Sequence, residues 1–232
     1  MLGVQKLARR CGLEITKRRF RSTDPELYAD VGASPVIIDV GAHYGALAMD
    51  FGNAFPAALI WAIEGHPDNF AVLEHNTRAL RARITPVHQV LGAEEGQSWL
   101  YEGDVSFTSS LLPTPTGRKR RVDVSTLSVF CRAHEIDRID ILKLDVEGAE
   151  IDVLTGGADL LERRRIRYVL AEAGLPNRSP GSRPITNLSD LWALVVVRYG
   201  YQPVGLYDVG YQPDGRLKNM NVLFKAPSAP AG

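Results

Sequence analysis

The chain has 232 residues, and its 27 Lys and Arg balance 27 Asp and Glu, so the formal net charge is zero. This balance gives no global attraction for nucleic acid, and a charged partner must be met locally. The length fits one α/β domain and is short for two. No apolar run reaches the length of a membrane span, and the N-terminus lacks the uninterrupted apolar core of a signal peptide, which predicts a cytoplasmic protein.

Residues 1–34 are predicted to form a basic segment with helical and extended parts. Seven Lys and Arg but only one acid, Glu14, fall within the first twenty-one residues. One interpretation is a helix and strand at the domain edge with solvated arginines, and the other is an amphipathic helix that contacts an anionic membrane surface. Residues 35–225 are predicted to be the main domain, and residues 226–232 a flexible tail.

An apolar run at residues 36–40 predicts a strand buried on both faces. Gly41 and Gly45 follow it, and glycines at this place let the backbone approach a ligand at the carboxyl edge of a parallel sheet. A second predicted strand ends in Glu64, about twenty residues further on, where such folds bond ribose hydroxyls. Together these features predict a cofactor that contains adenosine.

The rest of the chain alternates between helix and strand patterns, which is typical of a parallel sheet. Helices are predicted near residues 46–53, 67–80, 127–134, 151–161 and 187–199. Strands are predicted at residues 59–64, 84–90, 99–101, 122–124, 139–145, 167–172, 201–207 and 220–224. The last two flank Pro213-Asp214-Gly215, which predicts an antiparallel hairpin. The charge run 117–121 is interpreted as a solvated loop, with a phosphate clamp as the alternative.

Three acids follow buried strands at the predicted carboxyl edge. Asp145 and Glu147 leave one strand and Glu172 leaves its expected neighbour, so all three are expected to line one acceptor pocket. Lys143 precedes Asp145 by two residues and therefore lies on the same strand face. It would steer Asp145 or stabilise a developing alkoxide, and the alternative is a buried ion pair.

The residues Asp39–Gly45, Glu64 and, above all, LKLDVEGAE at 142–150 resemble the FkbM family of S-adenosylmethionine-dependent O-methyltransferases. The resemblance runs from residue 36 to residue 224. It implies an α/β, Rossmann-like class I methyltransferase fold, with a mostly parallel seven-stranded sheet and a C-terminal antiparallel hairpin. It also implies methyl transfer to a hydroxyl of a saccharide, glycolipid or other natural product. One departure is Glu172, which lacks the nearby histidine that many members carry.

The resemblance and the loop pattern together assign the site residues. The expected contacts of S-adenosyl-L-methionine are Asp39, Gly41, His43, Tyr44, Gly45, Glu64, Gly65, His66, Gln89, Val90, Ser109 and Ser110. An alcohol is a poor nucleophile unless a base or a metal helps its proton to leave. Asp145 is the first choice of base, and the further catalytic candidates are Lys143, Glu147, Glu172 and His43. Alternatively, Asp145 and Glu172 bind Mg²⁺, a hard cation that takes oxygen ligands.

Two other functions are weighed against this one. A nicotinamide oxidoreductase is disfavoured by the spacing of Gly41 and Gly45 and by the final hairpin. A cofactor-binding scaffold with a decayed catalytic edge is suggested by the missing histidine after Glu172, whereas Asp145, Glu147 and Lys143 argue against it. The expected partner is a small-molecule or saccharide acceptor with a free hydroxyl, and not nucleic acid. The sequence leaves the oligomeric state open.

Overall fold

The computed structural model describes residues 21–102, 109–113, 117–175, 184–212 and 215–227. The predicted basic helix and most of the predicted tail lie outside these residues, as do residues 213–214 of the predicted turn. Within the described ranges, no helix combines the length and apolar character that a bilayer crossing requires.

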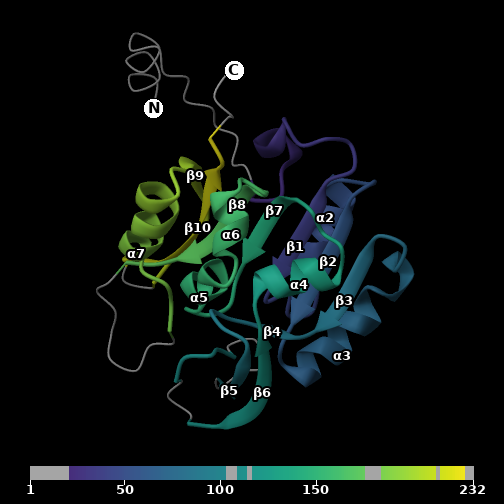
Figure 1. The fold of residues 1–232 in the computed structure, drawn as a ribbon, viewed down its shortest axis with the longest axis vertical. Coiled ribbons are helices and arrows are strands. Elements are labelled where there is room, and N and C mark those ends of the chain that lie inside the picture. Colours follow the sequence, from purple (N-terminus) through teal and green to yellow (C-terminus); the bar gives the residue numbers. More distant parts are fainter. Residues whose placement is uncertain (1–20, 103–108, 114–116, 176–183, 213–214, 228–232) are drawn as a thin grey trace.

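Seven strands form the main sheet. They are β1 (Val36–Val40), β2 (Leu59–Glu64), β3 (Ile84–His88), β7 (Ile139–Leu144), β8 (Ile166–Ala173), β9 (Gln202–Tyr211) and β10 (Leu217–Lys225). Their order is β3-β2-β1-β7-β8-β10-β9 (Figure 1), with β10 antiparallel to β8 and β9 and the other neighbours parallel. This confirms the predicted α/β fold and its C-terminal antiparallel hairpin. The order reverses between β1 and β7, where open α/β sheets bind ligands.

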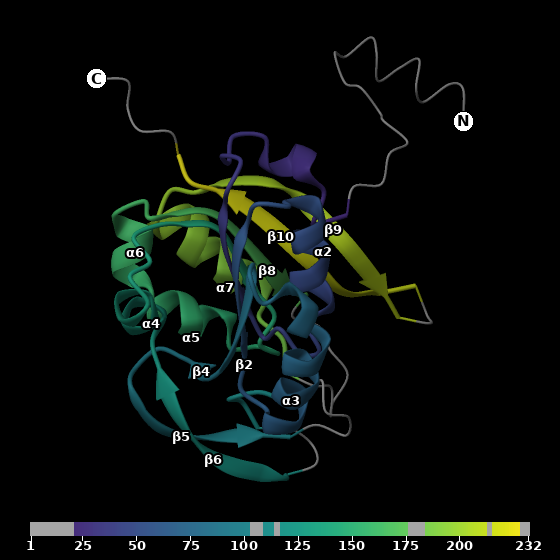
Figure 2. The same ribbon diagram turned by 90° about the vertical axis from the view of Figure 1, so that its right-hand side faces the viewer.

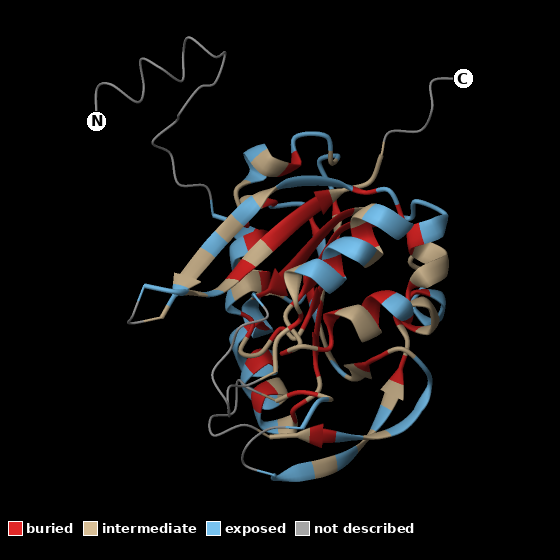
Figure 3. Ribbon diagram, turned by 90° about the vertical axis from the view of Figure 1, so that its left-hand side faces the viewer, coloured by how far each residue is buried: buried red, intermediate tan, exposed pale blue. Residues whose placement is uncertain are grey.

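Helices cover both faces of the sheet (Figure 2). One face carries the 3₁₀-helices η1 (Pro25–Tyr28) and η2 (Arg78–Leu80) and the helices α2 (Ala46–Ala54) and α3 (Pro67–Asn76). The other carries α4 (Leu127–Ala133), α5 (Glu150–Thr155), α6 (Ala158–Glu162), α7 (Leu188–Trp192) and the π-helical η4 (Ala193–Arg198). Two apolar clusters, one on each face, therefore bury the central strands, which Figure 3 shows between more exposed helices.

A second sheet of three strands lies beyond the carboxyl edge of the main sheet (Figure 1). It consists of β4 (Val90–Leu91), β5 (Gly96–Tyr101) and β6 (Lys119–Ser125), in the order β4-β6-β5. The interpretation of the charge run as a loop is therefore wrong from Lys119 onward. Lys119, Arg121 and Asp123 are exposed and alternate with half-buried residues, because successive side chains of a strand point to opposite faces.

Three predicted elements are divided in the structure. The predicted helix 151–161 is two helices, α5 and α6, separated by Gly156 and Gly157. A Cβ atom at Gly156 would lie 2.2 Å from the Gly92 carbonyl oxygen, so the backbones pass there at a distance that only glycine permits. The predicted helix 67–80 ends at Asn76 and continues as η2. The predicted strand 84–90 ends at His88, and Val90 pairs instead with Val124 of the small sheet.

Asp30 ties the segment after η1 to strands β8 and β10. Its carboxylate lies 2.8 Å from Lys225 Nζ and 3.6 Å from an Arg167 guanidinium nitrogen, and it accepts a hydrogen bond from the Tyr168 hydroxyl. Partial burial raises the pKa of Asp30. Hydrogen bonds from Lys225 and Tyr168 and the nearby positive charges outweigh this effect, so the pKa lies below its ordinary value.

We expect Asp30→Asn to lower the free energy of unfolding at neutral pH. Because the folded pKa is depressed, this contribution is present above the unfolded pKa of about 3.9 and is lost as the pH falls through the folded pKa. The Asp30 side chain is 42% exposed, so solvent screening limits the effect to about 0.5–1 kcal/mol. Urea denaturation of the variant and wild type, repeated at decreasing pH, measures the difference. The exposed Asp50→Asn is the control, and a pH-independent difference would contradict the ion-pair explanation.

Candidate active site

An open cavity lies at the carboxyl ends of β1, β2 and β7, at the reversal of strand order; its empty space of about 570 Å³ includes adjoining solvent. Most of the predicted cofactor residues line it, namely Gly41, His43, Glu64, Gly65, His66, Gln89, Val90, Ser109 and Ser110. Of the catalytic candidates, it brings together His43, Asp145 and Glu147. The predicted residues outside the lining are Asp39, Tyr44, Gly45, Lys143 and Glu172.

The backbone conformation of the loop after β1 requires glycine at two positions. Gly41 has φ +82°, and a Cβ atom there would lie 1.9 Å from the Asp145 carbonyl oxygen. Gly45 has φ +85°, and a Cβ atom there would lie 2.7 Å from Leu73 Cδ1. The backbone N–H groups of Gly41 and Ala42 both donate to the Ile63 carbonyl at 2.9 Å. The loop is thus pinned against the ends of β2 and β7 and presents bare backbone to the cavity.

Glu64 at the end of β2 is buried in the cavity wall. Its two carboxylate oxygens accept hydrogen bonds from the backbone N–H groups of His43 and His66, each at 2.8 Å. Burial raises the pKa of Glu64, while these N–H groups and the Asn69 side chain oppose that shift. Since a carboxylate oxygen has more than one lone pair, Glu64 can accept further hydrogen bonds from a ligand.

His66 joins the cavity to the small sheet. Its Nε2 lies 3.6 Å from Glu102 Oε1, which also accepts hydrogen bonds from the Arg120 guanidinium at 2.7 Å. The other ring nitrogen, Nδ1, is buried and has no hydrogen-bond partner among the residues that the structure describes. A buried polar atom of this kind is rare in a folded protein, and here it belongs to a side chain in the cavity wall.

The loop after β7 is held in shape by Glu150. This side chain is fully buried and accepts hydrogen bonds from the backbone N–H groups of Val146 at 2.9 Å and Gly148 at 3.1 Å, and from the Thr186 hydroxyl. Glu150 lies in the first turn of α5, and its carboxylate folds back to close the loop. The closed loop presents Glu147, with φ 53°, to the cavity.

Ser110 connects this loop to the small sheet. Its hydroxyl donates to the Glu147 carbonyl oxygen at 2.7 Å and accepts from the Leu112 backbone N–H at 3.0 Å. Its backbone exchanges two hydrogen bonds with Tyr101 at the end of β5. Both Ser109 and Ser110 line the cavity, and Ser110 also fixes one of its walls.

Lys143 is buried between the central strands and is 1% exposed. Its ammonium group donates to the Leu144 carbonyl at 2.9 Å and to Asn221 Oδ1 at 3.0 Å, and lies 3.4 Å from Asp145 Oδ2. Asp145 is 43% exposed and reaches the cavity. The ion pair that was the alternative for Lys143 is therefore present, and the steering of Asp145 stays a prediction.

Asp39 lies below the cavity, opposite Lys143 in the β1–β7 ladder. Complete burial raises the pKa of Asp39 to about 7. The positive charge of Lys143 lowers this pKa, and the negative charges of Asp145 and Glu64 raise it. Its Oδ2 has no hydrogen-bond partner within the described part of the chain. The structure thus places Asp39 beside the buried amine and away from the cavity surface.

Glu172 does not share a pocket with the other two acids. Its carboxylate accepts a hydrogen bond from the Asn219 side chain, and it faces Asn221 in the β8–β10 ladder. No group of three or more His, Cys, Asp or Glu side chains in the described ranges is arranged to hold a metal ion. Asp145 lines the cavity and Glu172 does not, so the structure does not bring the two predicted Mg²⁺ ligands together in its lining.

Comparison with known proteins identifies the family. The sequence profile of the methyltransferase FkbM domain matches residues 39–203, which is more than half of the chain. The chain belongs to the FkbM methyltransferase family. Among its relatives, the 2-O-methyltransferase NoeI of Sinorhizobium fredii is 27% identical over 201 residues, covering 80% of this chain and 79% of NoeI.

Two further proteins show how far the likeness extends. The hexuronic acid methyltransferase AglP of Haloferax volcanii is 26% identical over 143 residues, covering 59% of this chain and 55% of AglP. The crystal structure of an FkbM methyltransferase from Methylobacillus flagellatus superposes with a TM-score of 0.56 at 20% identity. The match covers 82% of this chain and 44% of that one, so it supports the shared fold.

Several residues of this FkbM site do not follow from the sequence patterns. Asn69 is buried beside Glu64 in the first part of α3 and lines the cavity. Asn221 is the acceptor for the Lys143 amine. An asparagine between Met220 and Val222, in the otherwise apolar predicted strand 220–224, was the available signal for it. Apolar wall residues from the small-sheet region are Leu91, Leu100 and Leu111.

We expect Gly41→Ala to destabilise the protein by more than about 2 kcal/mol. The left-handed conformation costs an alanine about 1–2 kcal/mol, and its Cβ atom would also overlap the Asp145 carbonyl. Gly32→Ala is the matched control, because a Cβ atom there meets nothing within 4 Å. Urea denaturation compares both variants with wild type. Equal stability of the two variants would show that the loops after β1 and β7 do not make this close approach.

Proposed function

We propose that this protein transfers a methyl group from S-adenosylmethionine to a hydroxyl of a saccharide, glycolipid or related natural product. The observation that carries the proposal is Glu64, a buried carboxylate fixed by two backbone N–H groups in the wall of the cavity. Beside it, Gly41 leaves no room for a side chain. An acid and a glycine backbone at adjacent strand ends suit the ribose and the amino-acid end of this cofactor.

The remaining lining fits the same ligand. His66 supplies a buried ring nitrogen that has no hydrogen-bond partner in the described ranges, and Gln89, Val90 and Leu100 add apolar and amide surface for the adenine. Ser109 and His43 are the proposed contacts on the remaining sides. When bound, S-adenosylmethionine supplies an electrophilic methyl group attached to a sulfonium.

The acceptor side is assigned to the loop after β7. An alcohol becomes a competent nucleophile only if its proton leaves as the new bond forms, so a base must lie next to the acceptor oxygen. Asp145 is the proposed base, because its carboxylate reaches the cavity while Lys143 holds one of its oxygens. Glu147 lines the same part of the cavity, where it would orient the acceptor hydroxyls. Such orientation can supply on the order of 7–11 kcal/mol of a barrier.

The relatives support the choice of acceptor class. NoeI is named a 2-O-methyltransferase and AglP a hexuronic acid methyltransferase, so an oxygen acceptor and a sugar acid both occur among related chains. Membership of the FkbM family sets aside the nicotinamide oxidoreductase. A location in the cytoplasm and contact between residues 1–21 and a membrane remain predictions.

Calorimetric titration of the purified protein with S-adenosylmethionine, S-adenosylhomocysteine and NAD tests the cofactor assignment. We expect the two sulfur nucleotides to bind and NAD not to bind. Glu64→Gln should weaken binding at least about 10-fold, because hydrogen bonds to a charged group contribute about 1.5–3 kcal/mol. The exposed Glu74→Gln on α3 is the matched control. Binding of NAD alone, or an equal effect of both variants, would refute the proposed cofactor site.

Replacing the proposed base should separate chemistry from binding. In an assay with an acceptor found by screening saccharides against labelled S-adenosylmethionine, we expect Asp145→Asn to lower kcat by about 10²–10⁴-fold. The affinity for S-adenosylhomocysteine should stay within a few-fold of wild type. His43→Gln is the comparison, because burial lowers the pKa of His43, against the charge of Asp145, and leaves a neutral ring at pH 7. If His43→Gln alone abolishes turnover, His43 is the base.

A further inference from the structure

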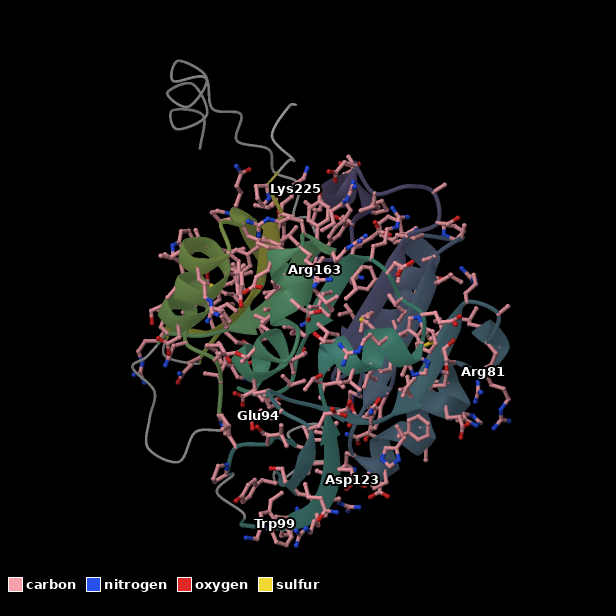
Figure 4. The ribbon with its side chains drawn as sticks, viewed as in Figure 1. Arg81, Glu94, Trp99, Asp123, Arg163 and Lys225 are labelled. Atoms are coloured by element: carbon pink, nitrogen blue, oxygen red, sulfur yellow. The ribbon has the colours of Figure 1, made fainter. Side chains whose placement is uncertain are left out.

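The outer face of the small sheet carries aromatic and cationic side chains that the proposed reaction does not use. In the antiparallel register of β5 and β6, Trp99 lies opposite Arg121 and Tyr101 opposite Lys119. We call these four residues the Trp99 face. Figure 4 shows Trp99 on the small sheet at the outer end of the molecule.

Trp99 remains 41% exposed although cations already approach it. Lys119 Nζ lies 4.5 Å from the Trp99 ring centroid and 5.8 Å from that of Tyr101, and the Arg121 guanidinium carbon lies 6.0 Å from the Trp99 ring. Neither cation forms an ion pair with a carboxylate of the described residues, whereas Arg120, their neighbour on the opposite face, pairs with Glu102. The face therefore presents one partly exposed ring and two charges to solvent.

The Trp99 face is the outside of a cavity wall. Leu100 lies between Trp99 and Tyr101, points to the opposite side of β5 and lines the cavity. Tyr101 exchanges backbone hydrogen bonds with Ser110, which also lines the cavity. A ligand longer than the cavity can thus place one unit inside and extend over the wall.

We propose that the Trp99 face binds the acidic saccharide chain to which the methylated unit belongs. This proposal deepens the proposed function and rests on it for the reacting unit. The negative face of an indole ring attracts the positively polarised C–H groups of a sugar ring. Lys119 and Arg121 would pair with its carboxylate or phosphate groups, and arginine does so with two parallel hydrogen bonds.

The charge pattern favours a short acidic chain over a membrane or nucleic acid. The two cations are followed on the same face by Asp123, which pairs with Gln97. The formal net charge of the whole chain is zero, so the rest of the protein adds no general attraction for a polyanion. Membrane and nucleic-acid surfaces are recognised by larger sets of basic residues than this one. A mixed face with one broad aromatic ring suits a ligand that alternates sugar faces with isolated charges.

Calorimetric titration of the full chain with oligogalacturonate, in the absence of cofactor, tests the proposal. We expect binding that weakens with added salt, and little binding of a neutral malto-oligosaccharide of equal length. Lys119→Glu/Arg121→Glu should weaken oligogalacturonate binding at least about 10-fold, and Trp99→Ala should do so separately. The matched control is Arg132→Glu/Arg163→Glu, which makes the same change of charge at exposed arginines on α4 and directly after α6.

The alternatives give different results. Equal losses in both charge-reversal variants would mean that only net charge matters, and equal binding of the neutral chain would remove the role of the cations. No binding of oligogalacturonate, or tighter binding of phosphatidylglycerol vesicles or single-stranded RNA through the same residues, would overturn the proposal. Affinity for S-adenosylhomocysteine, measured on the same variants, should not change. If wild type itself does not bind S-adenosylhomocysteine, that result refutes the cofactor site instead.

Discussion

The buried ammonium group of Lys143 is the constraint around which the catalytic edge is arranged. A cation in the middle of a sheet loses its hydration and is tolerated only if hydrogen bonds and opposite charges surround it. Three acceptors from three places meet this need, namely Leu144 on its own strand, Asn221 on β10 and Asp145 in the following loop. Asp39 adds a fourth polar group across the β1–β7 ladder.

This arrangement links structure to chemistry because the acceptors are not equivalent. Leu144 and Asn221 satisfy the amine from inside the protein, whereas Asp145 meets it at 3.4 Å and keeps much of its carboxylate at the cavity. Asn221 in turn donates to Asp208 on β9, so the hairpin at the sheet edge helps to place the amine. The final hairpin thereby contributes to the site without lining the cavity.

Sequence patterns predicted the parts of the site that depend on local spacing. Gly41 and Asp145 follow buried strands and Glu64 ends one, and parallel strands place such positions at one edge of the sheet. Glu172 lies near the carboxyl end of β8, yet the Asn219 side chain from β10 binds its carboxylate. That contact joins residues 47 positions apart in a ladder whose register no local pattern reveals. The contact of Asn221 could not be predicted for the same reason. The strands of the small sheet are short, so their sequence pattern did not predict that Leu100 lines the cavity.

The LDVEG segment shows why its residue types must occur together. Glu147 adopts φ 53°, which is uncommon for a residue with a side chain, and Gly148 adopts φ 97°, where glycine is favoured. Such a turn persists only where its surroundings over-determine it. The Glu150 carboxylate accepts hydrogen bonds from the backbone of the turn, and the Ser110 hydroxyl, next to the small sheet, donates to the Glu147 carbonyl. The strain is therefore held from two sides, and the same turn directs both Asp145 and Glu147 into the cavity.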